Sequence, residues 1–321
     1  YMKYKMLSSY FNGDLQTIEK ELEGSIRAND LLLQEACLHL LQAGGKRIRP
    51  VLVLLAAKFG EYNIDVIKKA AAALELIHMA SLVHDDVIDD AMLRRGAPTV
   101  QARWDNKIAM YTGDYILAQS LQLITELKNP LPHQLLSKTI VEVCLGEIEQ
   151  IRDKYHFDQS VTTYFRRIKR KTALLIATSC QLGGVVAGVE EEIHKRLFRF
   201  GYYVGMSYQI MDDILDFTAN EKVLGKPAGG DLKQGNITMP VFFAMEDSEL
   251  KKEIVKVHEG IEDKELKHII SSIKDSGAIE KSVEVSDRYL AKAFKELEGL
   301  PDIRAKKNLN DIAKYIGRRK F

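Results

Sequence analysis

The stretch Leu82–Asp90 (LVHDDVIDD) places four aspartates inside a mostly apolar run. A second stretch, Gln209–Asp216 (QIMDDILD), repeats the pattern far along the chain. In each stretch two aspartates stand four residues apart, and these pairs are Asp85 with Asp89 and Asp212 with Asp216. This spacing puts both carboxylates of a pair on one helix face. Because buried carboxylates repel one another and lose hydration, the pattern predicts two facing acidic helices around a hard divalent cation, and Mg²⁺ suits such a site.

Helical periodicity continues through most of the chain. Apolar residues recur at three- and four-residue spacings in segments 31–43, 51–59, 66–93, 107–127, 133–154, 161–187, 191–219, 239–258, 262–274, 277–298 and 302–316. No proline occurs between Pro132 and Pro227, so this long stretch has no helix breaker. Clear alternating strands are absent, and no linker divides the chain. We therefore expect an all-α protein with a single domain over residues 1–321, interrupted by one long loop at 221–240.

Composition excludes several classes of protein. The formal net charge is +1 and 46% of the 321 residues are hydrophobic, so no global field favours nucleic acid or an anionic membrane. Three cysteines show no paired spacing and are expected to be reduced thiols of a cytoplasmic protein; they are Cys37, Cys144 and Cys180. No apolar run reaches the roughly 18 residues of a membrane span. Tyr1 precedes Met2, and we expect it to be an addition before the native start.

Cationic residues accompany the acidic motifs. The segment Gly44–Pro50 (GGKRIRP) carries three positive charges after a flexible Gly-Gly pair. Further cations stand at Arg94-Arg95, at Lys171 and, in the long loop, at Lys226. Each of these taken singly is more typical of a solvated surface or of simple charge neutralisation. Together with two acidic helices they indicate a diphosphate site, because magnesium and basic side chains are what proteins use to hold that group.

The motifs, taken in order, resemble the trans-prenyl diphosphate synthase family. In chain order the matching segments are Gly44–Pro50 (isopentenyl diphosphate motif), His84–Asp90 with Arg94-Arg95-Gly96 (first aspartate-rich motif), Gln209–Asp216 (second aspartate-rich motif), and Gly225-Lys226-Pro227 with Gly230-Asp231-Leu232 (the loop that follows). One DDxxD motif alone is a weak signal, but four motifs in order are specific. The likeness runs from about Leu31 to the C-terminus and implies the isoprenoid synthase fold, a single large helical bundle with a central cavity.

The resemblance also implies the chemistry and the residues that perform it. The family joins an allylic diphosphate to isopentenyl diphosphate with Mg²⁺ as cofactor. The implied metal-binding residues are Asp85, Asp89 and Asp212, supported by Asp86 and Asp216. The implied contacts to the allylic diphosphate are Arg94, Lys171 and Lys226, and those to isopentenyl diphosphate are Lys46, Arg49, His78 and Arg95. Thr172 and Gln209 are expected to flank the carbocation, and the residues expected to be catalytic are Asp85, Asp89, Lys171 and Asp212.

Three further segments, His78–Ser81, Gly146–Gln150 and Tyr315–Gly317, resemble the large catalytic components of two-component synthases of the heptaprenyl group within this family. This likeness implies a farnesyl diphosphate primer and a long all-trans product for the menaquinone side chain, delivered to the membrane. It also implies a small non-catalytic subunit as partner, or otherwise a homodimer. Asn236 stands where many relatives have lysine, which we interpret as a mark of this subgroup. We do not expect nucleic acid to be a binding partner.

Two other functions are possible for this pattern of motifs. A terpene cyclase has the same helical fold, but it lacks a second diphosphate site and usually varies the second acidic motif. A non-catalytic synthase subunit should have lost aspartates, and here both clusters are intact. We therefore favour the chain-elongating prenyltransferase.

Small residues before the first acidic motif concern product length. Ser81 lies one helical turn before Asp85 on the same face, with Ala80 beside it. Short-chain relatives usually carry aromatic side chains in this region, so their absence favours a long product. Tight helix packing is an alternative reason for a small residue at Ala80. The floor of the tunnel is expected deeper, near Ile77, Leu74 or a residue of the helix around Ile140–Gly146.

Overall fold

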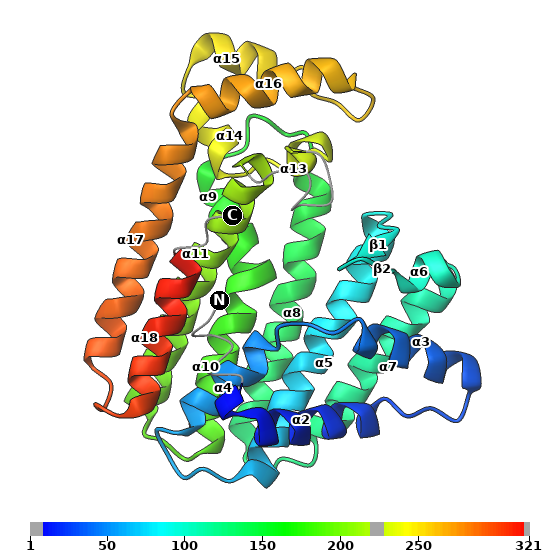
Figure 1. The fold of residues 1–321 in the computed structure, drawn as a ribbon, viewed down its shortest axis with the longest axis vertical. Coiled ribbons are helices and arrows are strands. Elements are labelled where there is room, and N and C mark those ends of the chain that lie inside the picture. Colours follow the sequence, from blue (N-terminus) through cyan, green and yellow to red (C-terminus); the bar gives the residue numbers. More distant parts are fainter. Residues whose placement is uncertain (1–8, 219–227, 318–321) are drawn as a thin grey trace. The chain divides into compact units, whose positions relative to one another are not determined.

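The computed structural model describes residues 9–218 and 228–317. The chain falls into two compact units. Unit 1 comprises Tyr1–Ile140, Thr178–Phe198 and Pro301–Leu309, and unit 2 comprises Val141–Ala177, Arg199–Leu300 and Asn310–Phe321. Both units are built from helices (Figure 1), which confirms the all-α fold class. A single domain over the whole chain stays a prediction.

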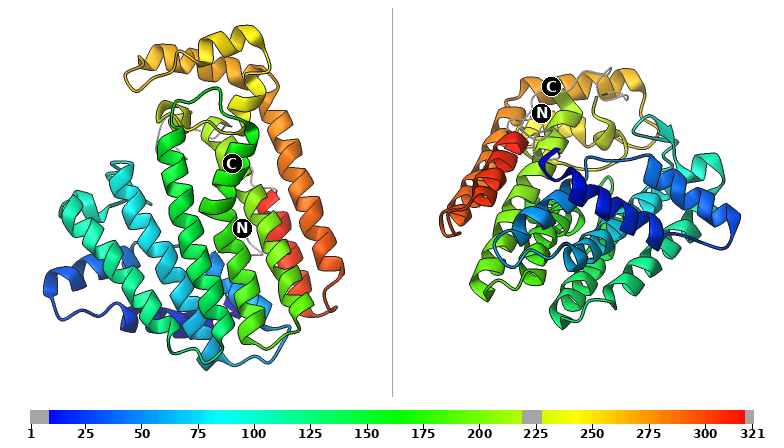
Figure 2. Two further views of the ribbon diagram at one scale, coloured as in Figure 1. Left: turned by 180° about the vertical axis from the view of Figure 1, so that it is seen from behind. Right: turned by 60° about the horizontal axis from the view of Figure 1, so that its bottom comes forward.

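Unit 1 is organised around a long helix, α5. Its helices are α2 (Asn12–Ser25), α3 (Leu31–Gln42), α4 (Ile48–Ala57), α5 (Ile64–Ile88), α6 (Val100–Arg103), α7 (Asn106–Ile124) and the start of α8 (Pro130–Asp153). Asn63 caps α5 by accepting a hydrogen bond from the Asp65 amide. The four alanines 70–73 are buried, and such small residues let neighbouring helices approach closely. In this unit α5 packs along α7, and α2 crosses α5 (Figure 2).

Unit 2 contains the second acidic helix and the C-terminal helices. Its elements are α9 (Val161–Ile168), a π-helix (Lys169–Ala173), most of α11 (Glu191–Thr218), α13 (Gly230–Lys233), α14 (Met239–Ala244), α15 (Ser248–Ile254), α16 (Asp263–Asp275) and α17 (Ala278–Glu298). Helices α10 (Leu174–Val186) and α18 (Arg304–Gly317) contribute to both units. One apolar cluster joins Tyr164 and Ile168 of α9 to Met211 and Ile214 of α11 and Met239 of α14.

Several predicted boundaries differ from the structure. The segment expected to be helical to residue 93 ends at Ile88, because Asp90 adopts a left-handed backbone with φ of 49°. The chain then forms a short antiparallel hairpin whose strands, β1 (Leu93–Arg94) and β2 (Ala97–Pro98), have two residues each. The predicted helix 239–258 is divided because Asp247 caps a new helix, accepting from the amides of Glu249 and Leu250.

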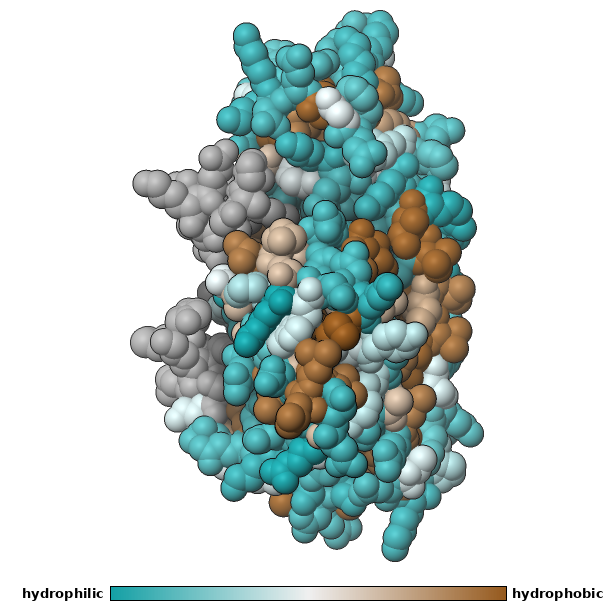
Figure 3. Space-filling model, turned by 90° about the vertical axis from the view of Figure 1, so that its right-hand side faces the viewer, coloured by the Kyte–Doolittle hydropathy of each residue, from teal (hydrophilic) through white to brown (hydrophobic). Residues whose placement is uncertain are grey.

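The N-terminal helix α2 was not predicted. Only Ile18 and Leu22 of its residues are buried, so its sequence carries little apolar periodicity. No helix among residues 9–218 and 228–317 is long and apolar enough to cross a membrane. Hydrophobic groups do reach the surface, and Figure 3 shows them among hydrophilic residues on one face.

Candidate active site

The first acidic motif forms the C-terminal end of α5 in unit 1. Asp85 and Asp86 are buried, with 9% and 3% of their surface exposed. The Asp89 amide donates a 2.8 Å hydrogen bond to the Asp85 carbonyl, so helical spacing extends to Asp89. The side chains of Asp85 and Asp89 therefore leave the helix on the same face, as the sequence predicted.

The second aspartate of this motif holds an arginine. Arg94 donates to both carboxylate oxygens of Asp86, with Nη2 to Oδ1 at 2.7 Å and Nε to Oδ2 at 3.1 Å. The β1–β2 hairpin returns Arg94 to the helix end that carries Asp86. Such a two-point pair fixes the guanidinium plane. Asp86 thus orients Arg94 here, and its expected support of a metal stays a prediction.

The basic segment before α4 depends on unusual backbone. Gly44 and Arg47 both have positive φ, 69° and 48°, a conformation that glycine adopts without strain. A Cβ on Gly45 would lie 2.6 Å from Arg95 Nη1, so the missing side chain makes room for the Arg95 guanidinium. Arg95 also donates to the Gly44 carbonyl. The Gly-Gly pair and the arginine after the first acidic motif therefore form one structural element.

Four arginines lie near enough to His78 for their charges to affect its pKa. Burial lowers the pKa of His78 well below its ordinary value, and the charges of nearby arginines lower it further; these are Arg49, Arg95, Arg94 and Arg47. The imidazole is therefore neutral at neutral pH, and the positive charge here is carried by guanidinium groups. Unit 1 thus brings together the predicted isopentenyl diphosphate residues Arg49, His78 and Arg95. Such a concentration of guanidinium groups suits a diphosphate.

One arginine of this cluster, Arg47, forms ion pairs with two glutamates. Arg47 donates to Glu19 of α2 and, at 3.1 Å, to Glu75 of α5. Glu75 is only 4% exposed. Arg47 therefore anchors the chain between the predicted ligand residue Lys46 and the first turn of α4, which carries Arg49.

The residues predicted to set product length lie on α5. Ile77 and Ala80 are buried, at 3% and 2% exposure, whereas Ser81 is half-buried. The Ser81 hydroxyl donates a 2.7 Å hydrogen bond to the His78 carbonyl. Their role in product length stays a prediction.

The second acidic motif is the centre of a hydrogen-bonded chain in unit 2. Tyr164 donates to Asp213 Oδ2 at 2.6 Å, and Gln209 Nε2 donates to Asp213 Oδ1 at 2.8 Å. The Thr172 hydroxyl donates to Gln209 Oε1 at 2.7 Å. Burial raises the pKa of Asp213 well above its ordinary value, and the charges of Asp231 and Asp212 add to this rise. The predicted pair Thr172 and Gln209 is thus in direct contact.

A π-helix carries the predicted residues Lys171 and Thr172. Short π-helical turns inside α-helices are frequent at functional sites, and this one covers Lys169–Ala173. Two glycines of neighbouring helices allow it to pack closely. A Cβ on Gly146 would lie 2.8 Å from Arg170 Cβ, and one on Gly205 would lie 2.6 Å from Ala173 Cα.

Lys171 is held by polar side chains of α8. Its Nζ donates at 3.0 Å to Glu147 Oε2 and at 3.0 Å to Gln150 Oε1. These contacts hold the ammonium group of Lys171 against α8. Its expected contact with an allylic diphosphate stays a prediction.

The last aspartate of the second motif binds the segment that follows it. Asp216 is 3% exposed, and its Oδ2 accepts a 3.0 Å hydrogen bond from the Asp231 amide. The Gly229 amide donates to the Asp216 carbonyl at 2.8 Å. Asp212, by contrast, is half-buried. Lys226, a predicted contact to the allylic diphosphate, lies outside the described residues.

Comparison with known proteins gives the family. Residues 30–273 match the polyprenyl synthetase family. The chain is 61% identical to heptaprenyl diphosphate synthase component 2 of Bacillus subtilis (strain 168), over all of this chain and 92% of that protein. The crystal structure of heptaprenyl diphosphate synthase from Staphylococcus aureus matches with a TM-score of 0.93 and 41% identity, covering 97% of this chain and 99% of the other.

The chain belongs to the polyprenyl synthetase family. A further relative, a polyprenyl synthase from Caulobacter crescentus crystallised with calcium and isoprenyl diphosphate, has a TM-score of 0.92 and 27% identity. It covers 99% of this chain and 98% of its own. The likeness to prenyl diphosphate synthases is thereby confirmed, together with the isoprenoid synthase fold. The chain is a prenyltransferase of the polyprenyl diphosphate synthase type, which sets aside a cyclase and a non-catalytic subunit.

Two residues of this polyprenyl synthase were missed from sequence. Glu75 stands between Leu74 and Leu76 in an apolar run, and a lone buried acid of that kind signals a buried partner. Tyr164 gave no such signal, because a tyrosine in an amphipathic helix is ordinarily a packing residue. Its contact with Asp213 joins residues far apart in sequence.

The donor sets of the acidic motifs fit magnesium. Among the described residues, no three acidic, histidine or cysteine side chains converge on a single metal position. Mg²⁺, however, is usually bound by one or two carboxylates, with waters and substrate phosphates filling its other positions. Asp85 and Asp89 on one helix face offer such a partial set, and the substrate diphosphate would complete it.

Proposed function

We propose that this polyprenyl synthase extends farnesyl diphosphate with isopentenyl diphosphate units to an all-trans heptaprenyl diphosphate. In each cycle the allylic carbon–oxygen bond breaks and diphosphate leaves. The double bond of isopentenyl diphosphate then forms a carbon–carbon bond to the allylic cation, and a proton is lost. Two relatives that match over nearly all of the chain, at 61% and 41% identity, carry the heptaprenyl name, which supports the product length.

The observation that carries the proposal is the group of arginines around His78. We propose that Lys46, Arg49, Arg95 and neutral His78 hold isopentenyl diphosphate. Guanidinium groups match phosphate oxygens with paired donors, while a neutral imidazole offers one donor and one acceptor. Arg94, oriented by Asp86, and Lys171, beside its glutamate, are proposed to hold the allylic diphosphate.

We further propose that Asp85, Asp89 and Asp212 bind Mg²⁺, with support from Asp86 and Asp216. When bound, the metal supplies electrostatic stabilisation of the leaving diphosphate. The Thr172 hydroxyl directs its proton to Gln209, so its lone pairs remain able to face the allylic cation. In this proposed arrangement the dipoles of neutral oxygens stabilise the positive charge of the cation.

Equilibrium binding of isopentenyl diphosphate tests the proposed diphosphate site. Arg49→Gln and Arg95→Gln should each weaken binding roughly tenfold to a hundredfold, since each loses a charge-assisted contact of about 1.5–3 kcal/mol. Arg103→Gln is the matched control, because it removes the same charge at a residue outside the proposed site. Arg103 stacks on Trp104, with its guanidinium carbon 4.7 Å from the ring centre. An equal loss in all three variants would contradict the site.

We also propose that the chain works with a smaller second subunit, as the name component 2 of its relative suggests. A stripe of α8 supports this proposal. Four apolar residues at helical spacing are each 43–61% exposed, and they are Val141, Leu145, Ile148 and Ile151. Exposed apolar patches of this kind mark interaction surfaces.

Cys144 provides a test of this interface, because it is exposed within the stripe. Iodoacetamide should label Cys144 in the chain alone and much more slowly once the second subunit is added. Burial raises the pKa of Cys37 and of Cys180 to about 12, so both stay unreactive thiols and serve as internal controls. Unchanged labelling of Cys144 in an active complex would place the interface elsewhere.

A further inference from the structure

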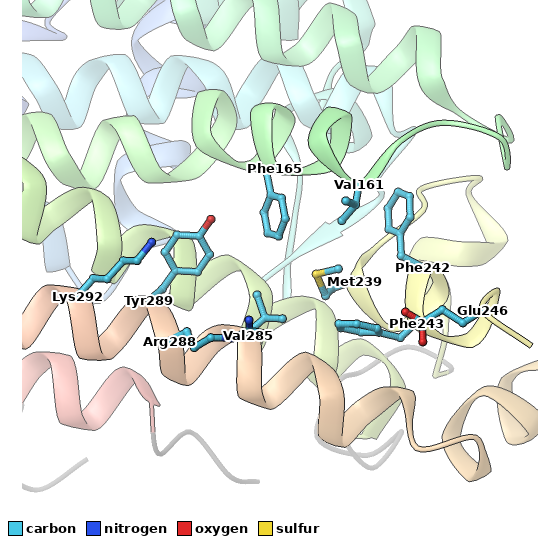
Figure 4. Close-up of a pocket in the computed structure, with 10 residues that line it drawn as sticks. All are labelled: Val161, Phe165, Met239, Phe242, Phe243, Glu246, Val285, Arg288, Tyr289 and Lys292. Carbon is cyan, nitrogen blue, oxygen red and sulfur yellow. The ribbon is translucent and has the colours of Figure 1, made fainter.

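Unit 2 contains a cavity that neither acidic motif lines. Its volume is about 470 Å³, and it lies between α9, α14 and α17 (Figure 4). Small-molecule sites commonly have volumes of about 300–1,000 Å³. Phe165 projects from α9 towards the other two helices, and the remaining wall is mostly apolar, with Met239, Phe242, Val285 and Tyr289. The cavity therefore has the size and lining of a site for an apolar ligand body.

The charged residues at this cavity are unbalanced. Glu246 is paired with Lys281 at 2.5 Å, so its charge is compensated. Arg288 and Lys292 stand one turn apart on α17 and also line the cavity. Among the described residues, no carboxylate is paired with either of them; Lys292 instead lies 5.6 Å from the ring centre of Tyr289. The cavity therefore carries two positive charges that a ligand could neutralise.

We propose that this cavity binds an anionic amphiphile, a molecule with a hydrocarbon tail and a phosphate-type head group. The apolar wall accepts the tail, and Arg288 and Lys292 accept the head group. Guanidinium and ammonium donors to a phosphate make strong charge-assisted hydrogen bonds. Arg288 and Lys292 are exposed at the rim, so a neutral amphiphile would gain no attraction from them, and a cationic one would be repelled. Head-group charge is thus the property that distinguishes the right ligand from the wrong ones.

The cavity wall is in contact with the hydrogen-bonded chain of the second acidic motif. The Tyr164 ring lies 5.5 Å from the Phe165 ring and 5.7 Å from the Phe242 ring, centre to centre. The Tyr164 hydroxyl is bound to Asp213. A ligand in the cavity would therefore touch the two rings that pack on Tyr164.

Calorimetric titration with dodecyl phosphate, below its critical micelle concentration, tests the proposal. The double variant Arg288→Glu/Lys292→Glu should lose one bound equivalent or bind it at least about tenfold more weakly, because two charge-assisted contacts are lost. The matched control is Lys264→Glu/Lys267→Glu on α16, which makes the same change of charge at two exposed residues. It should bind like the wild type, and dodecyl maltoside should bind much more weakly than dodecyl phosphate.

Binding of the ligand at the active site can be distinguished from binding in this cavity. The double variant keeps every proposed diphosphate residue, so a ligand bound there gives the same signal in all three proteins. Retained prenyl transfer and an unchanged melting temperature would show that the double variant is folded. Equal binding by the variant and the wild type, or equal binding of dodecyl maltoside, would overturn the proposal.

Two further arms distinguish the sources of such a ligand. Farnesyl monophosphate in solution represents a soluble prenyl phosphate, and phosphatidylglycerol vesicles, with phosphatidylcholine vesicles as control, represent a membrane lipid. A loss of binding by Arg288→Glu/Lys292→Glu in one arm alone identifies the corresponding source. No loss in either arm, compared with Lys264→Glu/Lys267→Glu, would contradict the site.

Discussion

The guanidinium of Arg47 donates a 3.1 Å hydrogen bond to the buried carboxylate of Glu75. Arg47 has a left-handed backbone and stands between Lys46 and Arg49, both proposed to hold isopentenyl diphosphate. Because Glu75 belongs to the same helix as His78, the ion pair joins the segment before α4 to the helix that carries His78. Glu75 is therefore a positioning residue for a diphosphate that it does not touch.

Glu75→Gln should raise the KM for isopentenyl diphosphate while changing kcat little, because the loop loses its anchor but keeps its ligand residues. Loss of a charge-assisted hydrogen bond should also lower the free energy of unfolding by about 1.5–3 kcal/mol. Steady-state kinetics with each substrate varied and denaturant unfolding measure both effects. The control is Glu126→Gln, which breaks the more exposed ion pair to Lys69 of the same helix, and exposed pairs contribute about 0–1 kcal/mol. An unchanged KM in Glu75→Gln would remove its positioning role.

Stability should fall in mild acid because of His78. Burial and four nearby arginines lower the pKa of His78, so the folded protein keeps it neutral, whereas the unfolded chain binds a proton below about pH 6.5. The unfolded state then binds more protons, and the free energy of unfolding falls as the pH drops through this range.

His78→Gln should make this pH dependence shallower by about 1 kcal/mol between about pH 7.5 and pH 5.5. Denaturant unfolding at the two pH values gives the slope. His258→Gln, at an exposed histidine, should keep the wild-type slope. If His78→Gln keeps it as well, the arginines do not hold His78 neutral.

Gly205→Ala should disturb the π-turn that carries Lys171 and Thr172. The added methyl would lie 2.6 Å from Ala173 Cα, and such overpacking costs about 1–3 kcal/mol. We expect a lower melting temperature and a lower kcat. Gly24→Ala in α2 adds a methyl into open space and should be neutral or slightly stabilising. Equal behaviour of the two variants would mean that the π-turn tolerates displacement.

Ser81→Phe should shorten the product while the first condensation continues. Ser81 is half-buried, so its side chain has more room than that of Ala80, which is 2% exposed. Ala80→Tyr would therefore cost more stability through overpacking, about 1–3 kcal/mol. Product chromatography and a melting curve separate the two effects. A folded Ser81→Phe enzyme that still makes the full-length chain would refute the tunnel assignment.

Local spacing accounts for the parts that were predicted correctly. The four-residue interval between Asp85 and Asp89 predicted a shared helix face, and in the structure Asp85 lies on α5 while Asp89 caps its end, its amide bonded to the Asp85 carbonyl. The approach of a diphosphate to the Gly-Gly pair before Lys46 stays a prediction, and in the structure it is the Arg95 guanidinium that lies against Gly45.

Other features depend on contacts between distant segments. The π-turn at Lys169–Ala173 is packed by Gly146 and Gly205 of neighbouring helices, and no local pattern marks such a turn. The Tyr164–Asp213 hydrogen bond likewise joins α9 to α11. The helix before the hairpin was predicted too long, because nothing in the sequence required the left-handed conformation of Asp90.

Product analysis tests the central claim most directly. The chain would be incubated with farnesyl diphosphate, labelled isopentenyl diphosphate and Mg²⁺, alone and with the small subunit, and the products would be resolved by length. We predict heptaprenyl diphosphate with the subunit, little elongation without it, and none after chelation of the metal. A cyclised hydrocarbon, or no incorporation of label by the complete mixture, would contradict the proposed function.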